Sequence, residues 1–231
     1  MKEQAKPLIC SGASAYYTGD SGSRYFAWQN SGAECTAKIT ALRFQPYVKA
    51  SDSVLDFGCG AGHVLRSLEC ARRVGFDVNP AACAAAREAG IECYDSVSEV
   101  PDESFEVIIS HHALEHVEHP VSVLRTLHRW LAPGGTLVLC LPIDDWRAQR
   151  VYLPQDINHH LHTWTPQLLG NSLCEAGFTP ERFSIRILTD AWFPGMTRIS
   201  RRTPALLLLA ARRIFSALAK RRQLLAVARK G

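Results

Sequence analysis

The stretch VLDFGCGAG at residues 54–62 decides the fold of this chain. A short apolar run leads through an acid into three glycines at alternate positions. A strand followed by a tight glycine-rich turn and a helix lets the backbone approach a ligand closely. The helix adds free N–H groups and the positive end of its dipole. We therefore predict that this turn binds a nucleotide-like cofactor.

Composition limits the class of protein. The chain has 231 residues, 47% of them hydrophobic, which suits one domain with a sizeable core and excludes wholesale disorder. The net charge of +4 is unevenly distributed, because residues 195–231 hold ten Lys and Arg and no Asp or Glu. Residues 1–194 therefore carry 16 basic and 22 acidic side chains. A basic tail on an acidic body indicates an anionic surface or partner for the tail.

The eight cysteines form no C-x-x-C pair, and several lie inside apolar runs. We interpret them as free thiols in a reducing compartment rather than as a disulfide framework. The first residues show no apolar stretch typical of a secretory signal, and the longest apolar run, residues 205–211, is far too short to span a membrane. These features predict a cytoplasmic protein.

Apolar segments alternate with helical ones along the middle of the chain. Strands are expected at residues 54–57, 73–76, 91–94, 105–110 and 136–141. Helices are expected at residues 62–70, at 80–88, and from Pro120 to a stop at Pro133-Gly134-Gly135. This alternation predicts an α/β fold with a doubly wound, Rossmann-like, mostly parallel seven-stranded sheet and helices on both faces.

Three regions are expected. Residues 1–52 form an N-terminal helical cap, irregular up to residue 23, and residues 53–190 form the cofactor-binding core, which ends with a helix at 165–176 and a strand at 182–188. Residues 191–231 add an insertion with a basic amphipathic helix at 204–220 and a final strand at 222–228. The apolar face of that helix comprises Leu207, Leu208, Ala211, Ile214, Phe215 and Leu218.

Two acids near the glycine turn restrict the cofactor. The dinucleotide fingerprint requires its third glycine at position 63, where this chain has His63, and this weakens an NAD interpretation. Asp56, two residues before the first glycine, would repel a pyrophosphate but can accept a hydrogen bond from an ammonium group. Asp77 closes the next strand and is placed to bind both hydroxyls of a ribose. The ligand therefore carries a ribose and a cationic group.

Over residues 53–178 the chain resembles the class I S-adenosylmethionine-dependent methyltransferases. VLDFGCGAG is similar to the first motif of that family, GFDVN to its second, and PDESFEVIIS with HHALEHV to its fourth-strand region. LHRWLAPGGTLVLCLP and WTPQLLGNSLCEAGF resemble later segments. The pattern is nearest to the small-molecule enzymes that include the ubiquinone-biosynthesis type. The resemblance implies methyl transfer from S-adenosyl-L-methionine.

The resemblance also assigns cofactor contacts. The glycines would admit the methionine part with Asp56 toward its amino group, Asp77 would hold the ribose, and Val78 would pack on the adenine. Asp95 or Ser96 would receive the adenine amine, and Ser110 and His111 would border the departing methyl group. The expected cofactor-binding residues are Asp56, Gly58, Cys59, Gly60, Gly62, Asp77, Val78, Asp95, Ser96 and Ser110.

The methyl group on a sulfonium is already activated, so the enzyme mainly aligns the acceptor with it. A base is required only when the acceptor is a hydroxyl or a carbon acid. Histidine is the natural base near neutral pH, and we expect His111, His159 or His160 to contact the acceptor. His112 and His116 are four residues apart beside Glu115, but the order is not H-E-x-x-H and no third ligand is spaced to match. No metal is therefore expected.

The expected acceptor is a small molecule, or a glycan-linked or lipid-linked intermediate, methylated at oxygen. Residues 110–112 lack the signature of enzymes that methylate planar amines in DNA or glutamine. The helix at 204–221 either packs on the domain or contacts the inner membrane surface, and its lack of interleaved aromatic residues disfavours nucleic acid. The alternatives are a catalytically silent binding module and an NAD-dependent oxidoreductase.

Overall fold

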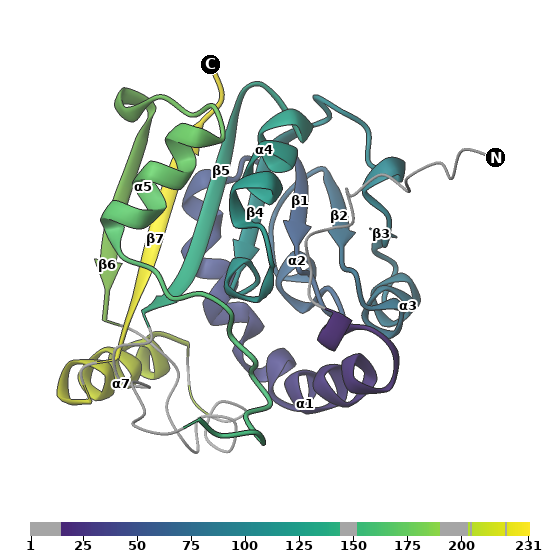
Figure 1. Cartoon of the computed structure of the whole chain (residues 1–231), viewed down its shortest axis with the longest axis vertical. Helices are drawn as coiled ribbons and strands as arrows, with labels where there is room; N and C mark the ends of the chain where they lie inside the picture. The colour runs from purple at the N-terminus through teal and green to yellow at the C-terminus, as the bar shows by residue number, and fades with distance from the viewer. Residues whose placement is uncertain (1–14, 144–151, 190–202, 204, 220) are drawn as a thin grey trace.

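A computed structural model describes residues 15–143, 152–189, 203, 205–219 and 221–231 (Figure 1). Its centre is one seven-stranded sheet in the order β3-β2-β1-β4-β5-β7-β6. β7 is antiparallel to both of its neighbours, and the pairs from β3 to β5 are parallel. The predicted doubly wound, mostly parallel sheet is therefore confirmed. The strands are β1 (Ser53–Phe57), β2 (Arg72–Phe76), β3 (Glu92–Tyr94), β4 (Phe105–His111), β5 (Leu131–Ile143), β6 (Phe183–Leu188) and β7 (Arg222–Arg229).

Helices cover both faces of the sheet (Figure 1). One apolar cluster packs beneath α4 and α5, and a second packs beneath α1, α2 and α3. The α-helices are α1 (Gly19–Phe44), α2 (His63–Arg66), α3 (Pro80–Glu88), α4 (Pro120–Trp130), α5 (Pro166–Glu175) and α7 (Ala205–Leu218). Short 3₁₀ turns are η1 (Ala15–Tyr17), η2 (Gln45–Tyr47), η3 (Val97–Glu99), η4 (Leu114–His116) and η6 (Pro180–Arg182).

Three predicted boundaries are wrong. A single helix begins at Gly19 rather than after residue 23, because tertiary packing of α1 outweighs its glycine- and serine-rich start. α2 ends at Arg66 rather than at residue 70, because the guanidinium of Arg73 donates to the carbonyls of Leu65 and Leu68 and so satisfies the end of the helix.

The third wrong boundary is the end of α4. The helix ends at Trp130, and fully buried Leu131 already pairs with Phe105 as the first residue of β5. The following Pro-Gly-Gly is an irregularity inside that strand, where a Cβ on Gly135 would lie 3.0 Å from the Phe105 carbonyl oxygen. Burial of an apolar side chain thus ends the helix before the breaker residues do.

The predicted free cysteines are contradicted at one pair. Cys83 in α3 and Cys93 in β3 form a disulfide, with their Cα atoms 5.6 Å apart. Cys59, Cys70, Cys140 and Cys174 form no disulfide. The pair was missed because helix-to-strand packing, not a short sequence spacing, brings the two residues within bonding distance.

The inward face of α7 also differs from the prediction. Leu208, Arg212 and Ser216 form the buried stripe, and Leu208 packs against Ile39 of α1. The side chains of Leu207, Ile214 and Leu218 are 63%, 64% and 80% exposed, so part of the predicted apolar face points outward. Among the described residues, no helix has the length and hydropathy needed to cross a membrane.

Candidate functional site

The glycine loop after β1 lies directly on the end of β2. The backbone N–H groups of Gly58 and Cys59 donate to the Phe76 carbonyl at 2.8 and 3.2 Å. Gly58 has φ +80°, and a Cβ there would lie 2.5 Å from the Cβ of Ala113. Only glycine therefore fits this position without strain, and the loop leaves its backbone open to the pocket described below.

Asp77 connects the glycine loop to the start of α3. Its Oδ2 accepts the Gly60 N–H at 2.9 Å, and its Oδ1 accepts the Asn79 N–H at 2.9 Å. Asn79 caps α3 by accepting from Ala81 N–H at 3.0 Å. Burial raises the pKa of Asp77, while the two backbone hydrogen bonds oppose that shift. Each carboxylate oxygen retains acceptor capacity for a hydroxyl group of a ligand.

Asp56 is a buried acid within β1. Its side chain accepts no hydrogen bond from the residues that the structure describes, although the residue is only 4% exposed. Burial, followed by the nearby carboxylate of Asp77, raises the pKa of Asp56 to about 7. A cationic group placed beside such a buried carboxylate stabilises its ionised form.

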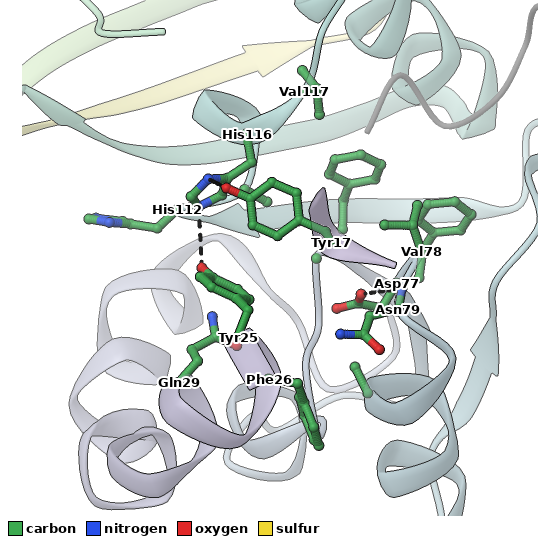
Figure 2. A pocket seen from close by; sticks show the side chains of 15 residues that line it. Tyr17, Tyr25, Phe26, Gln29, Asp77, Val78, Asn79, His112, His116 and Val117 are labelled. Carbon is green, nitrogen blue, oxygen red and sulfur yellow. Dashed lines mark hydrogen bonds between the residues drawn. The ribbon is translucent and has the colours of Figure 1, made fainter. Parts of the chain in front are cut away.

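A pocket of about 600 Å³, including its open mouth, lies beside the glycine loop (Figure 2). Figure 2 shows Asp77 and Asn79 at one side and the hydroxyls of Tyr17 and Tyr25 directed at His116 on the other. Its size suits a cofactor-sized ligand. The lining residues are Tyr17, Tyr25, Phe26, Gln29, Phe57, Gly58, Phe76, Asp77, Val78, Asn79, Ala82, His112, Ala113, His116 and Val117.

Tyr17 holds three chain segments together above the pocket. Its hydroxyl lies 2.6 Å from His116 Nδ1, 2.6 Å from the Asn158 carbonyl oxygen and 3.0 Å from the His159 carbonyl oxygen. Carbonyl oxygens only accept, so the single phenolic proton is donated to them and the phenolic oxygen accepts from His116 Nδ1–H. This assignment leaves His116 Nε2 as a hydrogen-bond acceptor, 3.4 Å from the Tyr25 hydroxyl.

Burial keeps both members of the Tyr17–His116 pair neutral. It lowers the pKa of His116 to about 3, with a smaller contribution from His160, and it raises the pKa of Tyr17 far above its ordinary value. At neutral pH the pair therefore carries no net charge, and its available group is the His116 Nε2 acceptor.

The three histidines expected at the acceptor lie at different distances from the pocket. His111 is outside the lining residues and accepts from Arg43 Nη1 at 3.3 Å through its Nε2. Burial, then His112, Arg43 and Arg212, lower the pKa of His111 well below its ordinary value. His159 stacks on Tyr16 at 4.3 Å between ring centroids, and His160 contacts the His116 ring at 4.8 Å. Their catalytic roles stay predictions.

Three of the ten expected cofactor-binding residues line the pocket. Gly58, Asp77 and Val78 line it, whereas Gly60 and Gly62 shape the loop with φ +53° and +72°. Asp56 and Cys59 are outside the lining, and the side chains of the last three have partners elsewhere. The Ser110 hydroxyl donates to the Phe57 carbonyl at 2.9 Å, Asp95 pairs with Arg87 at 3.6 Å, and Ser96 shares a hydrogen bond with Ser98 at 2.8 Å.

Sequence reasoning missed the contribution of the N-terminal segment to the pocket. Tyr17, Tyr25, Phe26 and Gln29 all line it, and they come from η1 and α1. The only available signal was the bulky Tyr16-Tyr17 pair within a glycine- and serine-rich stretch. Large aromatic side chains in such a stretch are expected to pack against another part of the fold, and the Tyr17 ring does so against the His116 ring.

The structure also supplies the third side chain that the sequence spacing lacked beside Glu115 and His116. His160, from the segment after β5, places a nitrogen within 4.8 Å of ligand atoms of those two residues. Glu115 is fully buried, with Oε1 3.6 Å from His112 Nδ1. His116 therefore belongs both to the pocket lining and to this polar cluster.

The donor side of the pocket fits S-adenosylmethionine. Asp77 in the lining has acceptor capacity for a ribose, and the glycine loop leaves room for the ligand. Buried Asp56, next to Phe57 of the lining, offers a carboxylate for an ammonium group. The fold and site together define a Rossmann-like protein that binds a cationic, ribose-bearing cofactor.

Comparisons with known proteins agree with this class. The family model described as a methyltransferase domain matches residues 27–182, so the chain belongs to the methyltransferase domain family. This membership confirms S-adenosylmethionine as the predicted cofactor and argues against NAD.

Individual relatives differ in the atom they methylate. A ubiquinone biosynthesis O-methyltransferase of Pseudomonas putida is 36% identical over 98 residues, 37% of this chain and 42% of the relative. Phosphoethanolamine N-methyltransferase 1 of Arabidopsis thaliana is 28% identical over 155 residues, 57% of this chain and 30% of the relative. The chain thus spans less than half the length of these curated relatives.

Solved structures share the fold. An S-adenosylmethionine-dependent methyltransferase of Thermotoga maritima superposes with a TM-score of 0.62 at 15% identity, covering 91% of this chain and 96% of that one. This likeness confirms the fold of the sheet and its helices.

Proposed function

We propose that this protein transfers a methyl group from S-adenosylmethionine to an oxygen atom of a small-molecule acceptor, either free or linked to a glycan or lipid. The main support for the proposal is that one pocket is lined by Gly58 and Asp77 on one side and by the Tyr17–His116 pair on the other. The cofactor, when bound, supplies a methyl group already activated on a sulfonium. The protein therefore has to hold and orient the acceptor.

The residues divide between the two halves of the pocket. Asp56 and Asp77 stabilise the polar groups of the donor, and Gly58 admits it without a side chain in the way. His116 Nε2 accepts a hydrogen bond from the acceptor hydroxyl and takes its proton only as that oxygen bonds to the methyl carbon, while Tyr17 fixes the imidazole through Nδ1. An acceptor held in this way keeps an oxygen lone pair available for in-line attack on the methyl carbon.

The lining favours a neutral acceptor. The only carboxylate among the described lining residues is Asp77, and these residues include no Lys or Arg. A phosphate-bearing or cationic acceptor would meet no complementary charge at the His116 end. A phenol or another neutral hydroxyl compound fits the phenolic and imidazole groups there, which supports oxygen over nitrogen as the methylated atom.

The test is methyl transfer from isotopically labelled S-adenosylmethionine to matched phenolic and amine acceptors. Phenols should be methylated, and His116→Ala should lower kcat by about a hundredfold or more with little change in cofactor affinity. His128→Ala is the control, because His128 packs against Phe178 away from the pocket lining. Preference for amines would overturn the oxygen assignment, and cofactor binding without any transfer would favour the silent binding module.

We also propose that α7 brings this site to an anionic membrane surface that carries a lipid-linked acceptor. Leu207, Ile214 and Leu218 project outward from the helix, and Arg213 is exposed beside them. Residues 195–231 contain no acid that would repel anionic headgroups. Exposed apolar side chains on a basic helix are typical of interfacial binding.

A further inference from the structure

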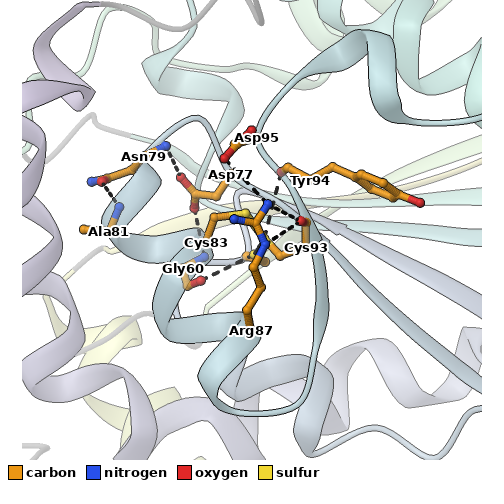
Figure 3. The surroundings of a disulfide bond; sticks show 10 residues. Gly60, Asp77, Asn79, Ala81, Cys83, Arg87, Cys93, Tyr94 and Asp95 are labelled. Carbon is orange, nitrogen blue, oxygen red and sulfur yellow. Dashed lines mark hydrogen bonds and ion pairs between the residues drawn. A yellow bond between two sulfur atoms is a disulfide. The ribbon is translucent and has the colours of Figure 1, made fainter.

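Three cysteine sulfurs meet beneath the cofactor loop. Cys83 and Cys93 form the disulfide between α3 and β3, and the free thiol of Cys59 lies 3.7 Å from Cys93 Sγ. Cys59 is the residue between Gly58 and Gly60, so this third sulfur belongs to the glycine loop itself. Figure 3 shows the disulfide beside Gly60 and Asp77.

Gly75 in β2 provides the space for this cluster. A Cβ on residue 75 would lie 2.5 Å from Cys59 Sγ and 3.3 Å from Cys93 Sγ. A residue with a side chain would therefore push the sulfurs apart. The missing side chain lets a free thiol and a disulfide remain adjacent inside a sheet that is otherwise closely packed.

We propose that Cys59, Cys83 and Cys93 form a thiol–disulfide exchange site that controls the cofactor loop. The Cys59 thiolate attacks Cys93 Sγ, a Cys59–Cys93 bond forms, and the Cys83–Cys93 bond breaks. Cys83 leaves as a thiolate and takes up the proton that Cys59 released, so the exchange needs no external oxidant or reductant.

The exchange changes which elements of the fold the disulfide joins. In the form described here, the disulfide joins α3 to β3, and the Cys59 thiol donates to the Gly60 carbonyl at 3.4 Å. After exchange the bond joins the glycine loop to β3, and the Cys59–Cys93 sulfur distance shortens from 3.7 Å to about 2.05 Å. The residue next to Gly60 is then drawn toward β3, away from the geometry in which Gly60 N–H binds Asp77.

The exchanged form should therefore bind the cofactor more weakly, and bound cofactor should slow the exchange. Burial raises the pKa of the Cys59 thiol well above its ordinary value, and the Asp77 and Asp56 carboxylates add to that shift. Exchange accordingly needs an opening of the loop, which bound cofactor opposes.

The first experiment maps disulfides in the full-length protein. The protein is incubated with catalytic glutathione, quenched with acid and N-ethylmaleimide, and digested without reduction. Peptides joined through Cys83–Cys93 and through Cys59–Cys93 are expected in the wild type, and the second should diminish when S-adenosylhomocysteine is present. Cys59→Ser should show only Cys83–Cys93, and Cys174→Ser, which removes an exposed free thiol, should behave as the wild type.

The second experiment measures S-adenosylhomocysteine affinity by calorimetry. Cys83→Ser, oxidised with glutathione disulfide to form the Cys59–Cys93 bond, should bind at least about tenfold more weakly than the same variant after reduction. The reduced sample serves as the control for folding of the variant. Absence of the Cys59–Cys93 peptide in the wild type, or equal affinity of the two forms, would overturn the proposal.

Discussion

At the scale of single residues, Asp56 has opposite effects on stability and on binding. Its pKa is raised from 3.8 to about 7 in the folded chain, so between these values the folded state keeps a proton that the unfolded state releases. Stability therefore falls as pH rises through this window, by up to about 4 kcal/mol for a shift of this size. The ionised carboxylate is at the same time the form that attracts a cationic ligand.

Asp56→Asn should separate the two effects. Above pH 7 the variant should be more stable than the wild type, because it has no buried charge, and below pH 4 the difference should vanish. S-adenosylhomocysteine should bind about ten- to a hundredfold more weakly, because one charge-assisted hydrogen bond is lost. Urea unfolding at the two pH values and calorimetry measure these changes. A variant that is less stable at pH 8 would contradict the assignment.

At the scale of elements, the glycine loop can be tested against a glycine of similar conformation elsewhere. Gly58 and Gly90 have φ of +80° and +79°, but a Cβ would meet Ala113 at 2.5 Å only at Gly58, whereas nothing lies within 4 Å at Gly90. Alanine at either position should cost about 1–2 kcal/mol of unfolding free energy through backbone strain.

Gly58→Ala should additionally weaken cofactor binding, and Gly90→Ala should leave it unchanged. The reason is that the loop can relieve the contact with Ala113 only by moving into the pocket. Calorimetry with S-adenosylhomocysteine on both variants gives the comparison. Equal affinities would show that the loop tolerates a side chain and that its glycines serve the turn alone.

The elements that sequence patterns predicted well are those determined by local periodicity. Buried strands such as β1 and β4 are continuous apolar runs, and α3 has its cap and its first-turn proline in the sequence. The prediction failed where distant contacts decide. Tyr17 contacts His116, which is 99 residues away along the chain. Cys83 bonds to Cys93 through packing of α3 on β3, and Arg212 is buried where a charge-based pattern places it in solvent.

At the scale of the whole molecule, an acidic body carries a basic and partly apolar C-terminal region. A triple variant, Leu207→Ser, Ile214→Ser and Leu218→Ser, should reduce flotation with vesicles of phosphatidylcholine and phosphatidylglycerol by about tenfold or more, because three exposed apolar side chains are lost. Higher salt should weaken binding of the wild type.

The matched control for this prediction is Leu168→Ser with Ile187→Ser, two side chains that are 53% and 47% exposed on α5 and β6. That double variant should float as the wild type does, and vesicles of phosphatidylcholine alone should recruit neither protein. Equal flotation of the triple variant and the wild type would remove α7 as the membrane contact.

The position of Tyr17 in the chain has a consequence for how such a protein can diversify. Gly58 and Asp77, which line the pocket and are proposed to contact the donor, lie within residues 27–182 that match the family, whereas Tyr17 and Tyr25 precede that range. Under the proposed function, His116 on the acceptor side lies inside the matched range, whereas Tyr17 and Tyr25 beside it lie on a stretch that can be replaced separately. Exchanging residues 15–26 between relatives should alter which compound is methylated while leaving the cofactor requirement intact. A shared cofactor site therefore does not predict a shared methyl acceptor.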